Sequence, residues 1–136
     1  MHKNGVLPCT TCELKLEEAD PILVGWFWNM KLKYPDLHVA WSYRGEADQH
    51  ADFLSGKSKL DYPNSKHNNT VNGKPSSLAL DVFTLDSAGV AHFNPDFYEQ
   101  LNEDTIAEGY KITWGGSWQT FKDLDHYQIA DDQPVA

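Results

Sequence analysis

The chain has 136 residues, a formal charge of −9 and 40% hydrophobic residues, so we expect one domain with its own core. Aromatic residues make up 12% of the sequence and include five tryptophans, which excludes an intrinsically disordered chain. The acidic charge, without any run of Lys or Arg, excludes nucleic acid as a favoured partner.

The N-terminal region contains a Cys-Thr-Thr-Cys sequence between Cys9 and Cys12. This spacing occurs in zinc and redox motifs, but a structural zinc would need two more ligands, and a redox site would need a following helix inside a βαβ unit, for which the sequence shows no pattern. Two reduced thiols or an incidental disulfide are therefore favoured, with a metal or redox role as the alternative. Residues 1–14 lack the apolar segment of a signal peptide, and no segment approaches the length of a membrane span, so we expect no membrane insertion.

A first helix is predicted from Asp20-Pro21, which has the form of an N-cap followed by proline at the first helical position. Apolar residues then recur at three- and four-residue spacing, which predicts one buried face. The helix should end at Pro35. The residues that make up this face are Ile22, Leu23, Trp26, Phe27, Met30 and Tyr34.

A strand is predicted over residues 38–44, because apolar and polar residues alternate there, and it would place Arg44 at its end. A short helix over residues 46–54 should follow, closed by Gly56. Residues 57–77 are rich in Ser, Asn, Lys, Gly and Pro, which predicts a long irregular loop with a functional or mobile role.

The second half of the chain predicts four strands and one helix. Turn residues at 86–89 separate the first two strands, and Asn94-Pro95 is a second cap-and-proline start for the helix. Taken together, the elements indicate a small α+β fold with a mostly antiparallel sheet and flanking helices. The predicted ranges are strands 78–85, 90–93, 111–114 and 126–130, and a helix over 95–108 with Phe97, Tyr98, Leu101 and Ile106 facing inward.

Asp81 is the residue that is hardest to explain as structure alone. It lies between Leu80 and Val82 in a predicted buried strand, where an ionised carboxylate is costly unless a cation or hydrogen-bond donors meet it. A metal ion would meet this need, and a solvated sheet face or an Arg or Lys partner is the alternative. The remaining histidines outside His67 and His126, namely His2, His38, His50 and His92, are interpreted as surface residues.

Two imidazoles, from His67 and His126, could join the carboxylate of Asp81 to form the smallest ligand set of a zinc hydrolase. Asp123 lies three residues before His126 and could move protons. Each of these residues taken singly has an ordinary structural interpretation. No helical zinc motif is present, so spacing alone does not establish the site.

Four motifs occur in order along the chain: Ser65-x-His67, Ala79-x-Asp81, Trp114-Gly-Gly-x-Trp118 and Asp123-x-x-His126, accompanied by Tyr43-Arg44, Gln49, Gly56-Lys-Ser58, Phe121 and Tyr127. This ordered set resembles the zinc peptidases of phage endolysins that cleave L-alanyl-D-glutamate bonds, relatives of D-alanyl-D-alanine carboxypeptidases. The resemblance spans residues about 20 to 130. It implies a fold like that of the Hedgehog/D-alanyl-D-alanine peptidases and a single metallopeptidase domain over residues 1–136, with residues 1–19 as an N-terminal extension.

The resemblance also implies roles for individual residues. One zinc ion would be held by His67, Asp81 and His126, with Asp123 as general base and acid. Arg44 would hold the substrate or the developing negative charge; an ordinary surface ion pair is the alternative for it, and a turn or cap acid is the alternative for Asp123. Substrate-binding residues would be Arg44, Ser65, Trp114, Gly115 and Gly116.

The sequence departs from the family pattern at two places. His67 and Asp81 are separated by fourteen residues instead of about seven, with residues 68–76 as an apparent insertion and Ser77 where glycine is usual. Added loop length costs only about 0.6 kcal/mol per doubling, so the insertion threatens substrate fit more than metal binding. Asp125 stands where proline is common. This leaves Asp123 or Asp125 as the base, with Asp123 preferred by register.

The function expected from this resemblance is a zinc endopeptidase of endolysin type that acts on the peptidoglycan stem peptide as a monomer. Without a signal peptide it would be made in the host cytoplasm and would reach the wall in the periplasm once the inner membrane opens. A D-alanyl-D-alanine carboxypeptidase or dipeptidase is the alternative within the same class. A non-catalytic wall-binding or phage structural module is the alternative outside it.

Overall fold

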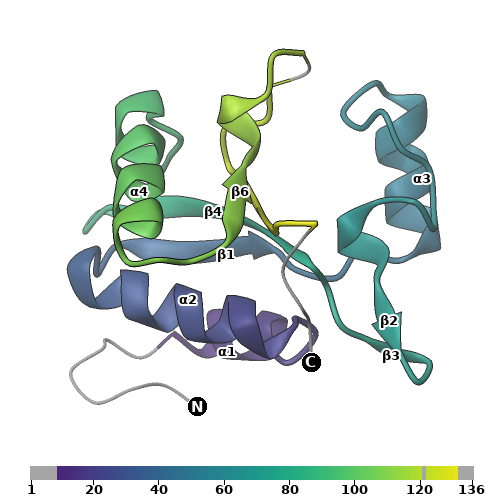
Figure 1. Ribbon diagram of the computed structural model, residues 1–136, viewed down its shortest axis with the longest axis horizontal. Helices are drawn as coiled ribbons and strands as arrows, with labels where there is room; N and C mark the ends of the chain where they lie inside the picture. Colours follow the sequence, from purple (N-terminus) through teal and green to yellow (C-terminus); the bar gives the residue numbers. More distant parts are fainter. Residues whose placement is uncertain (1–8, 121, 132–136) are drawn as a thin grey trace.

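The computed structural model describes residues 9–120 and 122–131 and has an α+β fold (Figure 1). Helices flank a mostly antiparallel sheet, which confirms the predicted fold class. The helices are α1 (Thr10–Leu16), α2 (Pro21–Lys33), α3 (Glu46–Leu54) and α4 (Pro95–Ala107), with two 3₁₀ turns, η1 (Lys66–Asn68) and η2 (Gly115–Ser117). The strands are β1 (Leu37–Trp41), β2 (Thr70–Val71), β3 (Lys74–Pro75), β4 (Ala79–Leu85), β5 (Ala91–His92), β6 (Ile112–Trp114) and β7 (His126–Ile129).

The main sheet is built around β4, in the order β1-β4-β7-β6, and β5 also pairs with β4. All of these pairings are antiparallel. Asp81 of β4 lies opposite His126 of β7 and, on the other side, opposite Trp41 of β1. Because residues directly opposite each other in an antiparallel pair have neighbouring side chains, this register alone brings the carboxylate and one imidazole together.

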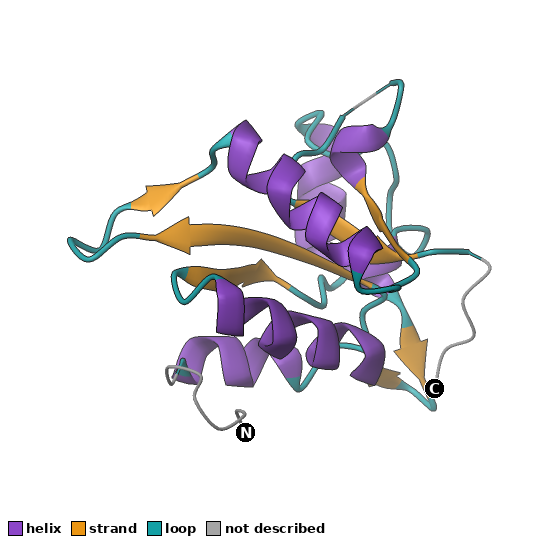
Figure 2. Cartoon of the chain, turned by 60° about the vertical axis from the view of Figure 1, so that its left-hand side comes forward, coloured by secondary structure: helices purple, strands orange, loops and turns teal. Residues whose placement is uncertain are grey.

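Helix α2 supplies much of the core, as the sequence pattern predicts. The Asp20 side chain accepts a hydrogen bond from the Ile22 amide, and proline follows at the first helical position. Trp26 is fully buried, packs its ring 5.1 Å from that of Tyr127 in β7, and donates from Nε1 to Thr105 Oγ1 in α4 over 2.9 Å. This residue therefore joins two helices to the sheet, and Figure 2 shows α2 lying alongside the strands.

Two details of the predicted elements are wrong. The first strand ends at Trp41, so Arg44 lies in the following loop, where its amide donates to the His67 carbonyl over 2.9 Å. In α4, Ile106 is 64% exposed and Thr105 is buried in its place. The reason is helical periodicity: Thr105 follows the buried Leu101 by four residues and shares its face, whereas Ile106 follows by five.

The insertion at 68–76 contains a small β-hairpin formed by β2 and β3, instead of the irregular loop that its composition predicts. Its turn consists of Asn72 and Gly73, with φ angles of 53° and 78°. Two consecutive residues with positive φ are typical of the type I′ turn, for which Asn-Gly is the favoured sequence. The hairpin forms its own two-stranded sheet and projects below α3, apart from the main sheet (Figure 1).

Within the part of the chain that the structure describes, every helix is too short or too polar to cross a lipid bilayer.

Candidate metal centre

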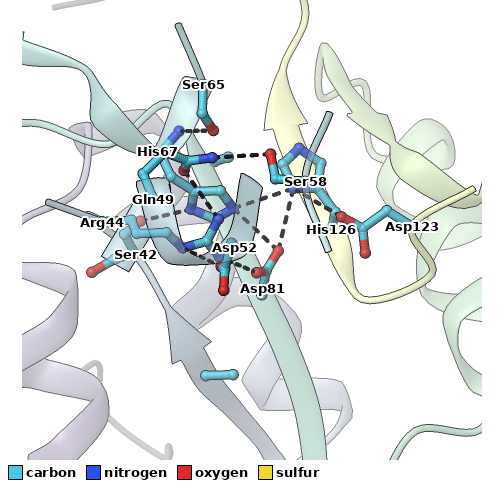
Figure 3. Close-up of polar contacts among 12 residues, drawn as sticks. Ser42, Arg44, Gln49, Asp52, Ser58, Ser65, His67, Asp81, Asp123 and His126 are labelled. Atoms are coloured by element: carbon cyan, nitrogen blue, oxygen red, sulfur yellow. Dashed lines mark hydrogen bonds and ion pairs between the residues drawn. The ribbon is translucent and has the colours of Figure 1, made fainter. Parts of the chain in front are cut away.

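Three side chains from separate elements meet at one point: His67 from η1, Asp81 from β4 and His126 from β7 (Figure 3). His67 Nε2 lies 3.3 Å from His126 Nδ1 and 3.3 Å from Asp81 Oδ1, and His126 Nδ1 lies 3.2 Å from the same oxygen. The three residues are 2%, 6% and 6% exposed. Two nitrogens and one oxygen thus form a nearly equilateral triangle in a buried position.

This triangle has the dimensions of one face of a zinc coordination tetrahedron. Zinc bonds to imidazole nitrogen and carboxylate oxygen of about 2.0–2.2 Å imply ligand-to-ligand separations of roughly 3.3–3.6 Å. The separations of 3.2–3.3 Å lie close to this range. Two histidines and one carboxylate also form a common ligand set of catalytic zinc, so the residues fit the ion that the sequence predicts.

Hydrogen bonds on the far side of each imidazole fix which nitrogen is free. His67 Nδ1 donates to the Ser42 carbonyl over 2.7 Å, which leaves the lone pair of Nε2 directed at the cluster. His126 Nε2 donates to Gln128 Oε1 over 2.8 Å, which leaves Nδ1 free in the same way. Both partners were missed as functional residues. Gln128 could have been identified because it shares a strand face with His126, whereas no local signal marks Ser42.

Local caps hold the backbone that carries His67. The Ser65 hydroxyl accepts a hydrogen bond from the His67 amide over 3.2 Å, and Asn68 Oδ1 accepts from the Ser65 amide over 3.0 Å, which completes a capping box. Asn68 also donates from Nδ2 to the Arg44 carbonyl over 2.8 Å. Ser65 therefore has a structural role, and it also lines the adjoining cleft.

Arg44 is 7% exposed, so the surface ion pair that we considered for it is wrong. Its Nη2 donates to Asp81 Oδ2 over 3.2 Å, its Nη1 donates to Gln49 Oε1 over 3.3 Å, and its Nε lies 3.4 Å from Asp52 Oδ2. The Trp41 ring lies 5.1 Å from the guanidinium carbon. Arg44 consequently occupies one carboxylate oxygen of Asp81 and leaves the other, Oδ1, for the two histidines.

The protonation states follow from these contacts. Burial would raise the pKa of Asp81, but the neighbouring charge of His67 and the hydrogen bond with His126 outweigh it and hold this pKa far below its usual range. Burial likewise opposes the charge of His126, but the Asp81 carboxylate outweighs it and raises the His126 pKa. The carboxylate is thus ionised, which is the form that binds a cation.

Two further acids lie beside the triangle. Asp123 Oδ2 is 3.8 Å from His126 Nδ1, and its side chain is 36% exposed. Burial, the charge of Asp81 and a hydrogen bond with Asp123 raise the pKa of Asp125 to about 8. Both acids line the cleft and lie close enough to Asp81 for the three carboxylates to form a second possible ligand group.

An open cleft of about 820 Å³ leads to the triangle. Trp118 lines it, with its ring 5.3 Å from that of His126. Trp114 is instead 8% exposed, stacks on Tyr127 in the core and is not among the residues that line the cleft. The other lining residues near the triangle are Arg44, Asp52, Ser65, Lys66 and Gln128.

Gly115 and Gly116 allow close packing behind the cleft. A Cβ on Gly115 would meet the Asp123 carbonyl oxygen at 2.4 Å, and one on Gly116 would meet the Trp114 ring at 2.2 Å. A side chain at Gly115 would therefore displace the segment that carries Asp123, and one at Gly116 would displace the Trp114 ring. The predicted contact of Trp114, Gly115 and Gly116 with substrate stays a prediction.

No family model matches the chain. Among solved structures, the chain is similar to the Serratia marcescens L-Ala D-Glu endopeptidase ChiX, with a TM-score of 0.69 and 26% sequence identity over 93% of this chain and 92% of that one. This likeness extends over nearly the full length of both chains, and together with the fold and the ordered motifs it supports the resemblance to the L-Ala-D-Glu endopeptidase family.

Proposed function

We propose that the protein is a zinc-dependent peptidoglycan endopeptidase that hydrolyses the L-alanyl-D-glutamate bond, or a neighbouring bond, of the stem peptide. The observation that carries this proposal is the buried triangle of His67, Asp81 and His126 at the cleft, with Asp123 beside it. The similar Serratia protein is described as an L-Ala D-Glu endopeptidase, which supports the substrate class.

Zinc would be held by His67 Nε2, Asp81 Oδ1 and His126 Nδ1, and when bound it would acidify a water molecule and polarise the scissile carbonyl. Asp123 then accepts the proton of the attacking water and delivers it to the leaving amine. Ser42 and Gln128 keep the two imidazoles in the ligand tautomers. No covalent intermediate with the protein is needed.

Arg44 contributes in two ways within this proposal. Its hydrogen bond to Asp81 Oδ2 orients the carboxylate so that only Oδ1 faces the histidines. Its guanidinium also lines the cleft, where it can stabilise the developing oxyanion or a substrate carboxylate. The adjoining loop is fixed by Gln49, which accepts from Arg44 Nη1 and donates to Ser58 Oγ over 2.9 Å.

The biological setting of this proposal is lysis of a bacterial cell by a phage-type enzyme. The substrate is the peptidoglycan stem peptide, which the enzyme reaches in the periplasm after the inner membrane has opened. The enzyme would act as a monomer in this proposal, which is supported by the fact that the three residues of the triangle come from one chain.

Product analysis on purified Gram-negative sacculi tests the proposal. We expect the zinc-loaded enzyme to release stem peptides with a new D-glutamate amino terminus, seen by mass spectrometry, and we expect chelation to stop this and zinc to restore it. Release of free D-alanine instead would indicate the carboxypeptidase alternative. Zinc binding without any new amino terminus would indicate the non-catalytic module.

Removal of the Gln128 side chain should weaken zinc binding without removing a ligand. Gln128→Ala deletes the acceptor for His126 Nε2, so the imidazole loses its orientation and its fixed tautomer. We expect zinc affinity to fall by about 10–100-fold, measured by competition with a chromophoric chelator. Gln119→Ala, at another residue that lines the cleft, is the matched control and should keep the wild-type affinity. Equal affinity of both variants would contradict the role given to Gln128.

A further inference from the structure

A second group of side chains of the kinds that bind metals, Cys9, Cys12 and His38, lies away from the cleft, where the start of α1 meets β1. His38 Nδ1 of β1 lies 3.2 Å from Cys9 Sγ and 3.5 Å from Cys12 Sγ. The two sulfurs form a disulfide in this structure. Cys9 is 6% exposed, Cys12 is fully buried, and His38 is partly buried, so its interpretation as a surface residue is wrong.

Contacts other than the disulfide also hold these residues in place. Cys9 is the N-cap residue of α1, and its Sγ accepts a hydrogen bond from the Cys12 amide over 3.2 Å. His38 is fixed by its strand, opposite Phe83 of β4, and its ring lies 5.8 Å from the Phe83 ring. Helix and strand thus bring both sulfurs to the same ring nitrogen.

One ring nitrogen can share a single proton with only one of two sulfurs at a time, whereas a cation can bind all three atoms together. For tetrahedral zinc, bonds of about 2.3 Å to sulfur and about 2.0–2.1 Å to nitrogen imply a sulfur-to-nitrogen separation of roughly 3.5 Å. The separations of 3.2 Å and 3.5 Å are close to this value, and once the disulfide is opened the two sulfurs need only move apart to the roughly 3.8 Å that two bonds to one zinc ion require. Two thiolates and one imidazole are donors that zinc prefers.

We propose that Cys9, Cys12 and His38 form a second, thiolate-rich metal site that binds zinc when the two cysteines are reduced. A dithiol reductant would open the disulfide by exchange: it supplies two electrons and two protons, the protein gains two thiols, and the reductant becomes a disulfide. Zinc binding then releases the two thiol protons to solvent, and His38 Nδ1 donates its lone pair with the ring proton on Nε2. A water molecule occupies the fourth position.

The consequence of this site would be structural. The ion would tie α1 to β1, where Lys15 Nζ already donates to the Ala40 carbonyl over 2.8 Å and Ser42 Oγ donates to the Lys15 carbonyl over 2.5 Å. The same residue, Ser42, also accepts a hydrogen bond at its backbone carbonyl from His67 Nδ1. The second site would therefore stabilise the segment around Ser42, which orients His67. None of Cys9, Cys12 and His38 lines the cleft.

Cobalt substitution and metal analysis of the full chain test this proposal. We expect the reduced wild-type protein to bind about two zinc ions per chain, and its cobalt form to show thiolate-to-cobalt charge-transfer absorption. The disulfide form of the same protein should bind about one ion and should lack this absorption. The comparison requires no substitution and so cannot fail through misfolding.

Three variants assign the signal to residues. Cys12→Ser and His38→Gln should each lose one zinc equivalent, and Cys12→Ser should lose the charge-transfer band, while peptidase activity continues. His126→Ala should keep the band, because it affects only the cleft triangle. His92→Gln is the matched control for His38→Gln, because His92 is an exposed histidine that pairs with Asp86. It should change neither the zinc content nor the charge-transfer band. The proposal would be overturned if the reduced wild-type protein bound only one zinc ion and its cobalt form showed no charge-transfer band. This outcome does not depend on whether the cleft triangle binds zinc.

Discussion

Replacing Asp123 by Asn should lower kcat/KM on peptidoglycan by about 10²–10⁴-fold, the range expected when a general base is lost. The carboxamide keeps the size of the side chain but cannot accept the proton of the attacking water. Zinc content should stay at the wild-type level, because Asp123 Oδ2 lies outside the triangle, 3.8 Å from His126 Nδ1. The rate of release of new amino termini and metal analysis of the same sample check both parts.

Asp125→Asn is the comparison that decides between the two acids. Asp125 also lines the cleft, but burial, the charge of Asp81 and a hydrogen bond with Asp123 raise its pKa to about 8 in the zinc-free protein, so most of this carboxyl group already carries a proton at neutral pH and is not available to accept another. We expect it to lose less activity than Asp123→Asn. A larger loss in Asp125→Asn, with zinc retained in both variants, would transfer the role of base to Asp125.

Replacing Asp81 by Ala should abolish activity by a different route, through loss of the metal. The substitution removes the only oxygen ligand of the triangle. We therefore expect zinc affinity to fall by more than about 100-fold, which is a larger loss than that expected when a hydrogen-bond partner of a ligand, such as Gln128, is removed. The substitution also removes the partner of Arg44 Nη2 and leaves Asp52 as the remaining carboxylate beside this buried guanidinium, which should cost about 1–3 kcal/mol of stability in the zinc-free protein.

Chemical denaturation of the zinc-free protein and competition with a chelator measure these two effects separately. Asp86→Ala is the control, because Asp86 lies in the turn before β5, away from the triangle, where it pairs with His92 and accepts hydrogen bonds from the Ala88 and Val90 amides. It should leave zinc affinity unchanged and lower stability by about 1 kcal/mol. If Asp81→Ala still bound one zinc ion with wild-type affinity in the cleft, the proposed ligand set would be wrong.

Local sequence signals were sufficient for the elements whose ends and faces are set by neighbouring residues. The capped start at Asp20-Pro21 predicts α2, and the turn residues before residue 90 predict the connection between β4 and β5. The alternating and apolar runs predict the strands that carry Asp81 and His126. The hairpin in the insertion was also readable from Asn72-Gly73, because this pair favours one turn type, but composition alone suggested an irregular loop.

The sequence by itself determined the fold class, most helix and strand positions and, through the ordered motifs, the residues that converge at the cleft. The metal-binding role of His67, Asp81 and His126 stays a prediction that their geometry supports. Only the tertiary structure decided how these residues are held. The register of β4 with β7 places His126 against Asp81, and the packing of distant loops gives His67 its Ser42 partner.

Tertiary structure also decided that Trp118 and not Trp114 lines the cleft, and that His38 meets the two cysteines. The physical reason is the same in each case. Helix periodicity, capping and turn preference act over a few residues and are visible in a short stretch of sequence. Side-chain partners that lie more than twenty residues apart, such as Cys12 and His38 or Ser42 and His67, depend on how whole elements pack, which no short stretch specifies.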